Sequence, residues 1–325
     1  MFKKTYKIGN SNLIRSKIGF GCWGLGGGST LNPSYGKISE VEAIRCLELA
    51  SRNEVNFFDT SPAYGSSEKI LGKFLKNKKR EEFFLASKCG ISDFKSRQDF
   101  SSVSLKKQLS KSLKNLGTDY LDLLQLHNPT EKILKNFDQF QFPIEEKESG
   151  RIRSFGISLK NPSDFFFIKN FEHIDSIQVN LNVLDTRLIE LGIAKICKKE
   201  KVSIISRTPL CFGFLSGNIK QNTKFSKNDH RKYWSQDQIK KWVESSKGLY
   251  ENVSQDKKCS QAQFCLKFCI SIPEITITIP GMMNINQVKE NTKVLDMEPL
   301  SSDEIYKIIK LNKIENYFLK GISIV

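Results

Sequence analysis

The chain has 325 residues, 39% of them hydrophobic and 26% charged, a balance typical of a globular protein with a substantial core. No apolar run is long enough to span a bilayer, and the basic residues near the N-terminus are not followed by the apolar segment of a signal peptide. The net charge of +16 is spread along the chain as lysine, without a nucleic-acid-binding signature. We therefore expect a cytoplasmic protein with no nucleic-acid or membrane partner.

Eight cysteines are scattered through the sequence without a C-x-x-C pair, and only three histidines accompany them. Disulfide frameworks and zinc sites require clustered spacings that are missing here. The pattern predicts free thiols in a reducing compartment and no metal site.

Short β-rich runs alternate with segments of helical periodicity along the chain. Most of the runs are nearly continuously apolar, as expected for parallel strands that are buried on both faces. The predicted strands are 18–21, 56–59, 83–88, 120–127, 152–158, 176–180, 202–206 and 276–279.

The segments between these runs predict helices. Ser39 and Glu42 form a capping box ahead of one helix, and Ser67 is predicted to cap the next. Leucines at 105, 109, 113 and 116 mark a third helix. Further helices are expected within 131–149, 162–170, 187–200, 259–270 and 284–295.

Eight βα units in a chain of this length predict a (β/α)8 barrel, with residues 1–325 forming one domain. Residues 211–258 are predicted to form a long loop and an extra helix that covers the site. A C-terminal helix is expected to start at Ser301 or Ser302.

Three glycines, Gly19, Gly21 and Gly24, spell the G-x-G-x-x-G pattern of a Rossmann dinucleotide site. That site requires a helix directly after the glycines and an acidic residue at the end of the next strand. Here the glycines lead into a loop, and the acidic residues at a suitable distance, Glu40 and Glu42, open a helix. The context therefore argues against a Rossmann fold.

Three successive predicted strands end in chemically active residues: Asp59, Lys88 and His127, with Tyr64 on the loop after the first of them. In a barrel, the C-terminal ends of the strands meet at one rim. A lysine ammonium near a tyrosine favours its ionised form, and an aspartate keeps the lysine charged. A neutral histidine orients a carbonyl by hydrogen bonding. Together these residues predict a proton donor directed at a carbonyl oxygen.

The segments "FFDTSPAYG", "LASK" and "LQLHNP", which contain these four residues, resemble the catalytic tetrad of the aldo-keto reductases. The resemblance continues through "KIGFGCWGLGG", "GRIRSFGIS", "IQVNLN", "ISRTPLCFGFLSG" and "IPGMMNINQVKEN". It implies a (β/α)8 barrel that reduces an aldehyde or ketone with a nicotinamide cofactor. Tyr64 is then the general acid, Lys88 and Asp59 lower its pKa, and His127 orients the substrate.

The resemblance also implies a cofactor site along the strand ends. Ser158 and Gln178 match the positions that hold the nicotinamide carboxamide, and Trp23 matches a substrate-pocket residue. The implied cofactor-binding residues are Gly21, Cys22, Trp23, Ser158, Gln178, Arg207, Thr208, Leu210, Gly213, Pro280, Gly281, Met283, Gln287, Glu290 and Asn291.

This sequence departs from the family pattern at several of these positions. Leu159 stands where many members have an asparagine that binds the carboxamide, and Arg207 stands where many stack an aromatic ring on the nicotinamide. The segment from Gly281 to Gln287 lacks the Arg or Lys that a 2′-phosphate favours. NADP(H) is the expected cofactor, and NAD(H) is the alternative.

Two other functions compete with a reductase. One is a cofactor-binding redox sensor or accessory subunit with little turnover, since one fold hosts many functions. The other is a lyase or isomerase that forms a Schiff base on Lys88, which would need a neutral amine. The sequence leaves the carbonyl substrate and the oligomeric state open. Aromatic and basic residues in the long loop, including Phe212, Phe214, Arg231, Lys232, Tyr233 and Trp234, suggest a sugar derivative or a phosphorylated aldehyde.

Overall fold

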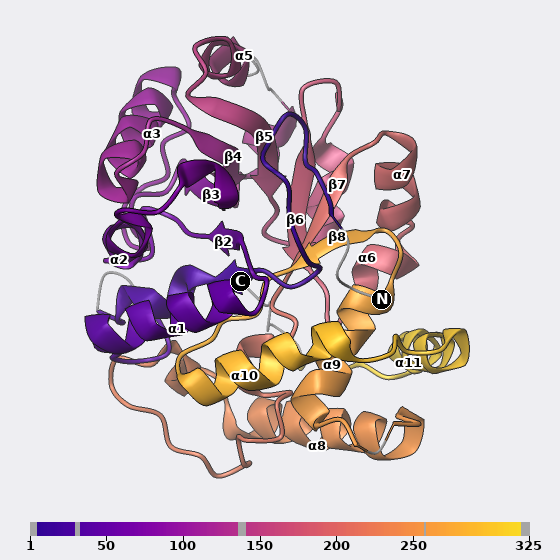
Figure 1. The fold of residues 1–325 in the computed structure, drawn as a ribbon. Coiled ribbons are helices and arrows are strands. Elements are labelled where there is room, and N and C mark those ends of the chain that lie inside the picture. Colours follow the sequence, from indigo (N-terminus) through magenta and orange to yellow (C-terminus); the bar gives the residue numbers. More distant parts are fainter. Residues whose placement is uncertain (1–4, 30–32, 136–140, 257, 320–325) are drawn as a thin grey trace.

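The computed structural model describes residues 5–29, 33–135, 141–256 and 258–319, and within them eight parallel strands form one sheet in sequential order. The sheet closes on itself because the backbone N–H of Gly19 donates to Thr278 O at 2.8 Å and that of Gly21 to Pro280 O at 2.9 Å. Helices surround the strands, as Figure 1 shows. The strands are β1 (Phe20–Gly21), β2 (Phe57–Asp59), β3 (Phe84–Cys89), β4 (Leu121–His127), β5 (Ile152–Ser158), β6 (Ser176–Asn180), β7 (Ser203–Arg207) and β8 (Ile275–Thr278).

The predicted (β/α)8 barrel is therefore confirmed, and each strand begins and ends within two residues of its predicted limits. The strand side chains are buried almost throughout, which explains the apolar runs. The helices are α1 (Glu40–Arg52), α2 (Ser67–Leu75), α3 (Ser102–Leu116), α4 (Glu131–Lys135), α5 (Gln141–Glu148), α6 (Arg187–Glu190), α7 (Ile193–Lys199), α8 (Gln236–Val253), α9 (Gln261–Ser271), α10 (Ile285–Lys293) and α11 (Ser302–Ile314).

Most helix predictions hold, and the exceptions have local causes. Ser39 caps α1 by accepting from the backbone N–H of Glu42 at 3.1 Å, as expected. Ser67 does not cap α2, because its hydroxyl lies inside the protein, 2.9 Å from both Thr60 Oγ1 and Cys22 O. The segment 162–170 forms only a 3-10 helix at Pro162–Phe167.

Two longer helical predictions are interrupted. The segment 187–200 is divided into α6 and α7, because Gly192 between them adopts a left-handed conformation with φ +73°. The segment 131–149 contains α4 and α5, and the part of it at 136–140 lies outside the described residues.

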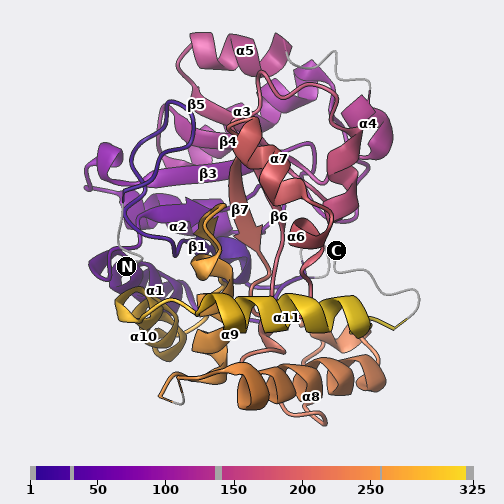
Figure 2. The same ribbon diagram turned by 90° about the vertical axis from the view of Figure 1, so that its right-hand side faces the viewer.

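The two additional helices lie outside the ring of βα units. The extra helix α8 follows the long loop after β7, and α11 begins with a capping box between Ser301 and Glu304. Figure 2 shows α8 and α11 side by side, next to α9. Within the described residues, no helix is both long and apolar enough to cross a membrane.

An N-terminal hairpin, residues 5–16, closes the end of the barrel that contains the strand N-termini. Tyr6 and Ile14 pair in antiparallel fashion, and Ile8 and Ile14 pack into the inner core of the barrel. Figure 1 shows this indigo segment crossing over the strands. The sequence pattern of these residues does not predict this element.

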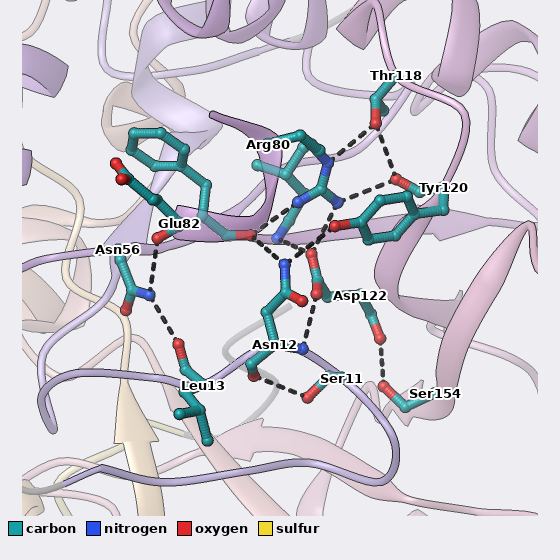
Figure 3. A network of polar contacts seen from close by, with 12 residues as sticks. Ser11, Asn12, Leu13, Asn56, Arg80, Glu82, Thr118, Tyr120, Asp122 and Ser154 are labelled. Atoms are coloured by element: carbon teal, nitrogen blue, oxygen red, sulfur yellow. Dashed lines mark hydrogen bonds and ion pairs between the residues drawn. The ribbon is translucent and has the colours of Figure 1, made fainter. Parts of the chain in front are cut away.

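Polar contacts fasten the hairpin to β4, as Figure 3 shows. Asp122, fully buried, accepts from the Asn12 backbone N–H at 2.9 Å and pairs with Arg80 Nη2 at 2.7 Å. Arg80 also donates to Thr118 Oγ1 at 2.9 Å and to Tyr120 O at 3.0 Å. The network holds one end of the barrel closed and leaves the opposite rim for the polar strand ends.

Candidate active site

The four residues of the predicted tetrad meet at the C-terminal rim of the barrel. Asp59, Lys88 and His127 end or nearly end β2, β3 and β4, and the parallel register places these positions side by side. Tyr64 follows β2 in a tight turn, in which its backbone N–H donates to Ser61 O at 3.0 Å. The arrangement expected from the sequence is therefore present.

Lys88 and Asp59 form a buried ion pair. The Lys88 ammonium donates to Asp59 Oδ1, and to Thr60 O at 3.0 Å. Burial lowers the pKa of Lys88, but Asp59 and Tyr64 outweigh it, so that the pKa is raised above its usual value. Lys88 therefore carries a positive charge at neutral pH.

Tyr64 is half-buried, with the Lys88 ammonium 4.9 Å from its ring centroid. Burial raises the pKa of Tyr64, Lys88 lowers it, and the net shift is upward. The expected lowering by Lys88 is thus present but smaller than the effect of burial. The phenol remains protonated at neutral pH and is able to donate a proton.

His127 is buried, and its ring lies 5.7 Å from that of Tyr64, at 88° to it. Burial, followed by the charges of Lys88 and Arg207, lowers the pKa of His127 well below its usual value. Its Nδ1 is 3.2 Å from Ser61 Oγ, which fixes the orientation of the ring. The predicted neutral histidine agrees with this environment.

Two buried amide side chains donate hydrogen bonds to Asp59. Gln125 Nε2 donates to Asp59 Oδ2 at 3.1 Å, and Gln178 Nε2 donates to the same oxygen at 2.8 Å. Ser158 Oγ donates to Gln178 Oε1 at 3.3 Å. Ser158 and Gln178 are among the residues expected from the sequence, whereas Gln125 is not.

A cavity of about 350 Å³ extends from the tetrad along the ends of β6, β7 and β8 to α10. Asp59 and Tyr64 lie in its wall, whereas Lys88 and His127 are not part of its lining. The predicted cofactor residues that line it are Gly21, Trp23, Gln178, Arg207, Thr208, Leu210, Gly213, Pro280, Gly281, Met283, Gln287, Glu290 and Asn291.

Two predicted cofactor residues are not in this lining. Cys22 is buried, and its thiol donates to Phe20 O at 3.6 Å. Ser158 is buried behind Gln178 and makes the contact described above. The cavity also has lining residues that the sequence analysis did not place in the cofactor site: Tyr35, Lys37, Pro209, Phe212, Ser216, Asn218, Ile219, Arg231, Ala262 and Ile279.

The segment after β7 forms one wall of the cavity with an unusual backbone. Thr208, Cys211 and Phe212 have positive φ angles of 53°, 42° and 58°. Such angles are uncommon outside glycine and cluster at functional sites. They turn the chain tightly around the cavity before it reaches Gly213.

Two cations in this wall are already engaged by protein groups. Arg207 Nη2 donates to Leu159 O at 2.9 Å and to Lys160 O at 3.1 Å, while its buried Nε has no partner among the described residues. Arg231 pairs with Asp229, with Nη2 and Oδ2 2.6 Å apart. Neither guanidinium is fully available to a ligand.

Aromatic rings surround the mouth of the cavity at the tetrad. Trp23 packs against Tyr35 at 5.1 Å and against His230 at 4.5 Å between ring centroids. Phe94, on the loop after β3, lies 6.4 Å from Tyr64 and was not predicted.

The long loop covers this region as expected, but fewer of its side chains reach the cavity than its sequence suggests. Phe212 lines the cavity. Tyr233 is 76% exposed and Phe214 is fully buried, and neither of these two side chains lines the cavity. Trp234 packs on Phe212 at 4.7 Å. Lys232 is exposed and donates to Lys227 O at 2.7 Å.

The cavity has the donor set that a dinucleotide requires. Lys37 and Arg207 offer positive charge, and the unpartnered Arg207 Nε is a buried donor without an acceptor among the described residues. Gln178 offers its amide oxygen to a carboxamide, because both hydrogens of its Nε2 are donated to Asp59 and Gln125. Glu290 and Asn291 offer polar groups at α10. The residues present therefore fit such a group.

Comparison with known proteins agrees with this geometry. Residues 17–313 match the model of the aldo/keto reductase family. The chain is 29% identical to L-galactose dehydrogenase of Arabidopsis thaliana, over 91% of this chain and 90% of that protein. It is 24% identical to the NADH-specific methylglyoxal reductase of Escherichia coli (strain K12), over 92% and 96% of the two chains. The solved holo structure of an aldo-keto reductase from Bacillus halodurans superposes with a TM-score of 0.74 at 26% identity, covering 95% and 96%.

Proposed function

The chain belongs to the aldo/keto reductase family, whose members are nicotinamide-dependent oxidoreductases, and we propose that it interconverts an aldehyde or ketone with its alcohol through Tyr64. The observation that carries this proposal is the meeting of Asp59, Tyr64, Lys88 and His127 at one end of the cavity. We infer that NADP(H) is the favoured cofactor, with NAD(H) as the alternative, and that Gln178, Arg207 and the walls around Gly213 and Asn291 hold it.

The proposed chemistry divides the work among the four residues. His127, neutral and held by Ser61, donates a hydrogen bond to the carbonyl oxygen of the substrate. Tyr64 donates its phenolic proton to the same oxygen, and Lys88 stabilises the tyrosinate that remains. The cofactor, when bound, supplies the hydride for the carbonyl carbon.

The ionisation of Lys88 weighs against the Schiff-base alternative. An amine nucleophile must be neutral, and a lysine with a raised pKa and a buried aspartate partner is protonated. The redox-sensor alternative has no specific observation in its favour, because every member of the tetrad is present.

The substrate itself is proposed only as a small carbonyl compound. Arg231 and Lys232 are both bound to protein groups, so the long loop offers less charge to an anionic substrate than its sequence suggests. All eight cysteines are buried free thiols, which supports a reducing, cytoplasmic location.

The test is a spectrophotometric assay of NADPH and NADH oxidation against a panel of aldehydes, ketones and sugar derivatives. For Tyr64→Phe we expect a loss of about 10²- to 10⁴-fold in kcat with an unchanged cofactor Kd, because only the proton donor is removed. Full activity in Tyr64→Phe would contradict the assigned role. Tight cofactor binding without turnover by the wild type would favour the sensor.

A further inference from the structure

One buried residue next to the tetrad has no role in the function proposed above. Gln125 lies in β4, fully buried between Leu124 and Leu126. A buried amide is costly unless its donors and acceptors are satisfied. Its contacts therefore show what the side chain does.

Asp59 fixes the orientation of the Gln125 amide. The carboxylate of Asp59 is ion-paired with Lys88 and accepts hydrogen bonds without donating any. Because Gln125 Nε2 donates to Asp59 Oδ2 at 3.1 Å, the carbonyl oxygen of the same amide is left as an acceptor. Gln125 Oε1 accepts from Gln178 Nε2 at 3.2 Å.

The orientation of the Gln178 amide then follows. Its Nε2 donates one hydrogen to Asp59 Oδ2 at 2.8 Å and the other to Gln125 Oε1 at 3.2 Å. A flipped amide would place its carbonyl oxygen against these two acceptors, with no hydrogen between them. Gln178 Oε1 must therefore stay on the other side, where Ser158 Oγ donates to it at 3.3 Å.

Gln178 also lines the cavity, so the acceptor that it presents there is a fixed property of the site. A carbonyl oxygen has two lone pairs, and Ser158 uses one of them. The second suits an N–H donor. The nicotinamide carboxamide has such a donor, and the proposed function places the cofactor against Gln178.

We propose that Gln125 is a positioning residue for the cofactor: together with Asp59 it locks the Gln178 amide so that Oε1, and not the NH₂ group, faces the nicotinamide carboxamide. This inference depends on the proposed function for the identity of the ligand. Gln125 touches neither cofactor nor substrate in this role and acts through Gln178.

The test compares two dinucleotides that differ only at the group in question. NADP⁺ has a carboxamide, whereas its 3-acetylpyridine analogue has a methyl group in place of the NH₂ and donates no hydrogen bond. In Gln125→Met, which keeps an unbranched side chain of similar length, we expect the Kd for NADP⁺ to rise about three- to tenfold, the size of one hydrogen bond. The Kd for the analogue should change less than twofold. Titration calorimetry measures both.

The controls separate this role from a structural one. Gln178→Met should lose the same preference for NADP⁺, and the double variant should lose no more than either single variant. If Gln125→Met weakens both dinucleotides equally, or neither, the positioning role is wrong. If the wild type binds neither dinucleotide, the proposed function fails first and this inference falls with it. Should Gln125→Met not fold, as judged by circular dichroism, Gln125→Leu gives the same comparison.

Discussion

Tyr64 experiences two opposing influences, and their balance predicts the pH dependence of the reaction. Burial raises the pKa of Tyr64 more than Lys88 lowers it. The phenol therefore stays protonated up to a pH above the usual tyrosine pKa, which is near 10. His127 stays neutral through the same range because its pKa is well below 6.5. We therefore expect kcat/KM for reduction to be flat from about pH 6 to about pH 9 and to fall only above the usual tyrosine pKa. A decline centred at neutral pH, in assays with a constant-ionic-strength buffer series, would contradict these assignments.

Lys37 provides a second prediction at the scale of single residues. It lines the cavity, is exposed, and makes no hydrogen bond or ion pair with the described residues, whereas Arg207 and Arg231 are engaged by protein groups. If a cofactor 2′-phosphate binds here, Lys37 is the cation available to it.

We expect Lys37→Gln to raise the Kd for NADPH by about three- to tenfold and to leave the Kd for NADH unchanged, in line with one charged contact. Fluorescence titration of both cofactors measures this. The matched control is Lys289→Gln, since Lys289 is exposed on α10 and does not line the cavity. Equal losses for both cofactors in Lys37→Gln would show that this lysine does not distinguish them.

The sequence was most informative where chemistry and strand ends coincide. Asp59, Lys88 and His127 stood directly at the ends of apolar runs, and a parallel barrel brings such ends together. Lys37 and Phe94 gave no comparable signal, because a side chain in a loop has no periodicity that shows its direction. Gln125 has a recognisable signal in the sequence, because a single amide within the strand "LDLLQLH" must find a buried hydrogen-bond partner.

At the scale of elements, the short 3-10 helix η1 (Cys22–Gly26) determines where the loop of Tyr64 can lie. A Cβ at Gly26 would sit 1.8 Å from the backbone oxygen of Tyr64, which no real contact allows. Gly26 is thus explained by close packing against the loop that carries the proton donor.

We predict that Gly26→Ala lowers the free energy of unfolding by about 1–3 kcal/mol and reduces kcat, because the Tyr64 loop must move. Gly248→Ala is the matched control, since Gly248 lies within α8 and a Cβ there meets no atom within 4 Å. That substitution should stabilise the protein by about 0.5–1 kcal/mol without changing kcat. Urea unfolding and steady-state kinetics on both variants measure these effects. An unchanged kcat in folded Gly26→Ala would contradict the proposed effect of Gly26 on the position of the Tyr64 loop.

Local sequence signals predicted the caps and lengths of the helices less well than their positions. Ser67 looked like a cap because serine usually caps, but its hydroxyl is used inside the protein by Thr60 and Cys22. Asn161 and Asp164 form a capping box at Pro162, yet the helix that follows stops at Phe167. Local signals identify where a helix begins more reliably than how far tertiary packing lets it continue.

At the scale of the whole molecule, the number and spacing of βα units were enough to predict a closed barrel. The N-terminal hairpin was not predicted, although Gly9-Asn10 is a turn dipeptide between Ile8 and Ile14. Two apolar residues in a lysine-rich segment indicate no strand by themselves. The role of Ile8 and Ile14 is visible only in the folded barrel, where they pack against the apolar side chains of its inner core.

The polar network beneath that cover predicts a separation between stability and activity. Asp122 accepts from Arg80 at 2.7 Å, from the Asn12 backbone at 2.9 Å and from the Leu85 backbone at 2.9 Å, and it is fully buried. In Asp122→Asn, the charge is lost and an NH₂ group faces donors. We expect the free energy of unfolding to fall by about 3–5 kcal/mol, the cost of breaking a buried pair.

The same substitution should leave kcat and the cofactor Kd within twofold of wild type under conditions where the variant is folded, because the network lies at the end of the barrel opposite Tyr64. Asp119→Asn, on the exposed turn before β4, serves as the control and should change neither stability nor activity. Urea denaturation and cofactor titration on the three proteins measure both properties. If Asp122→Asn lost activity while remaining as stable as wild type, the two ends of the barrel would be coupled, and the hairpin would have to be regarded as part of the site.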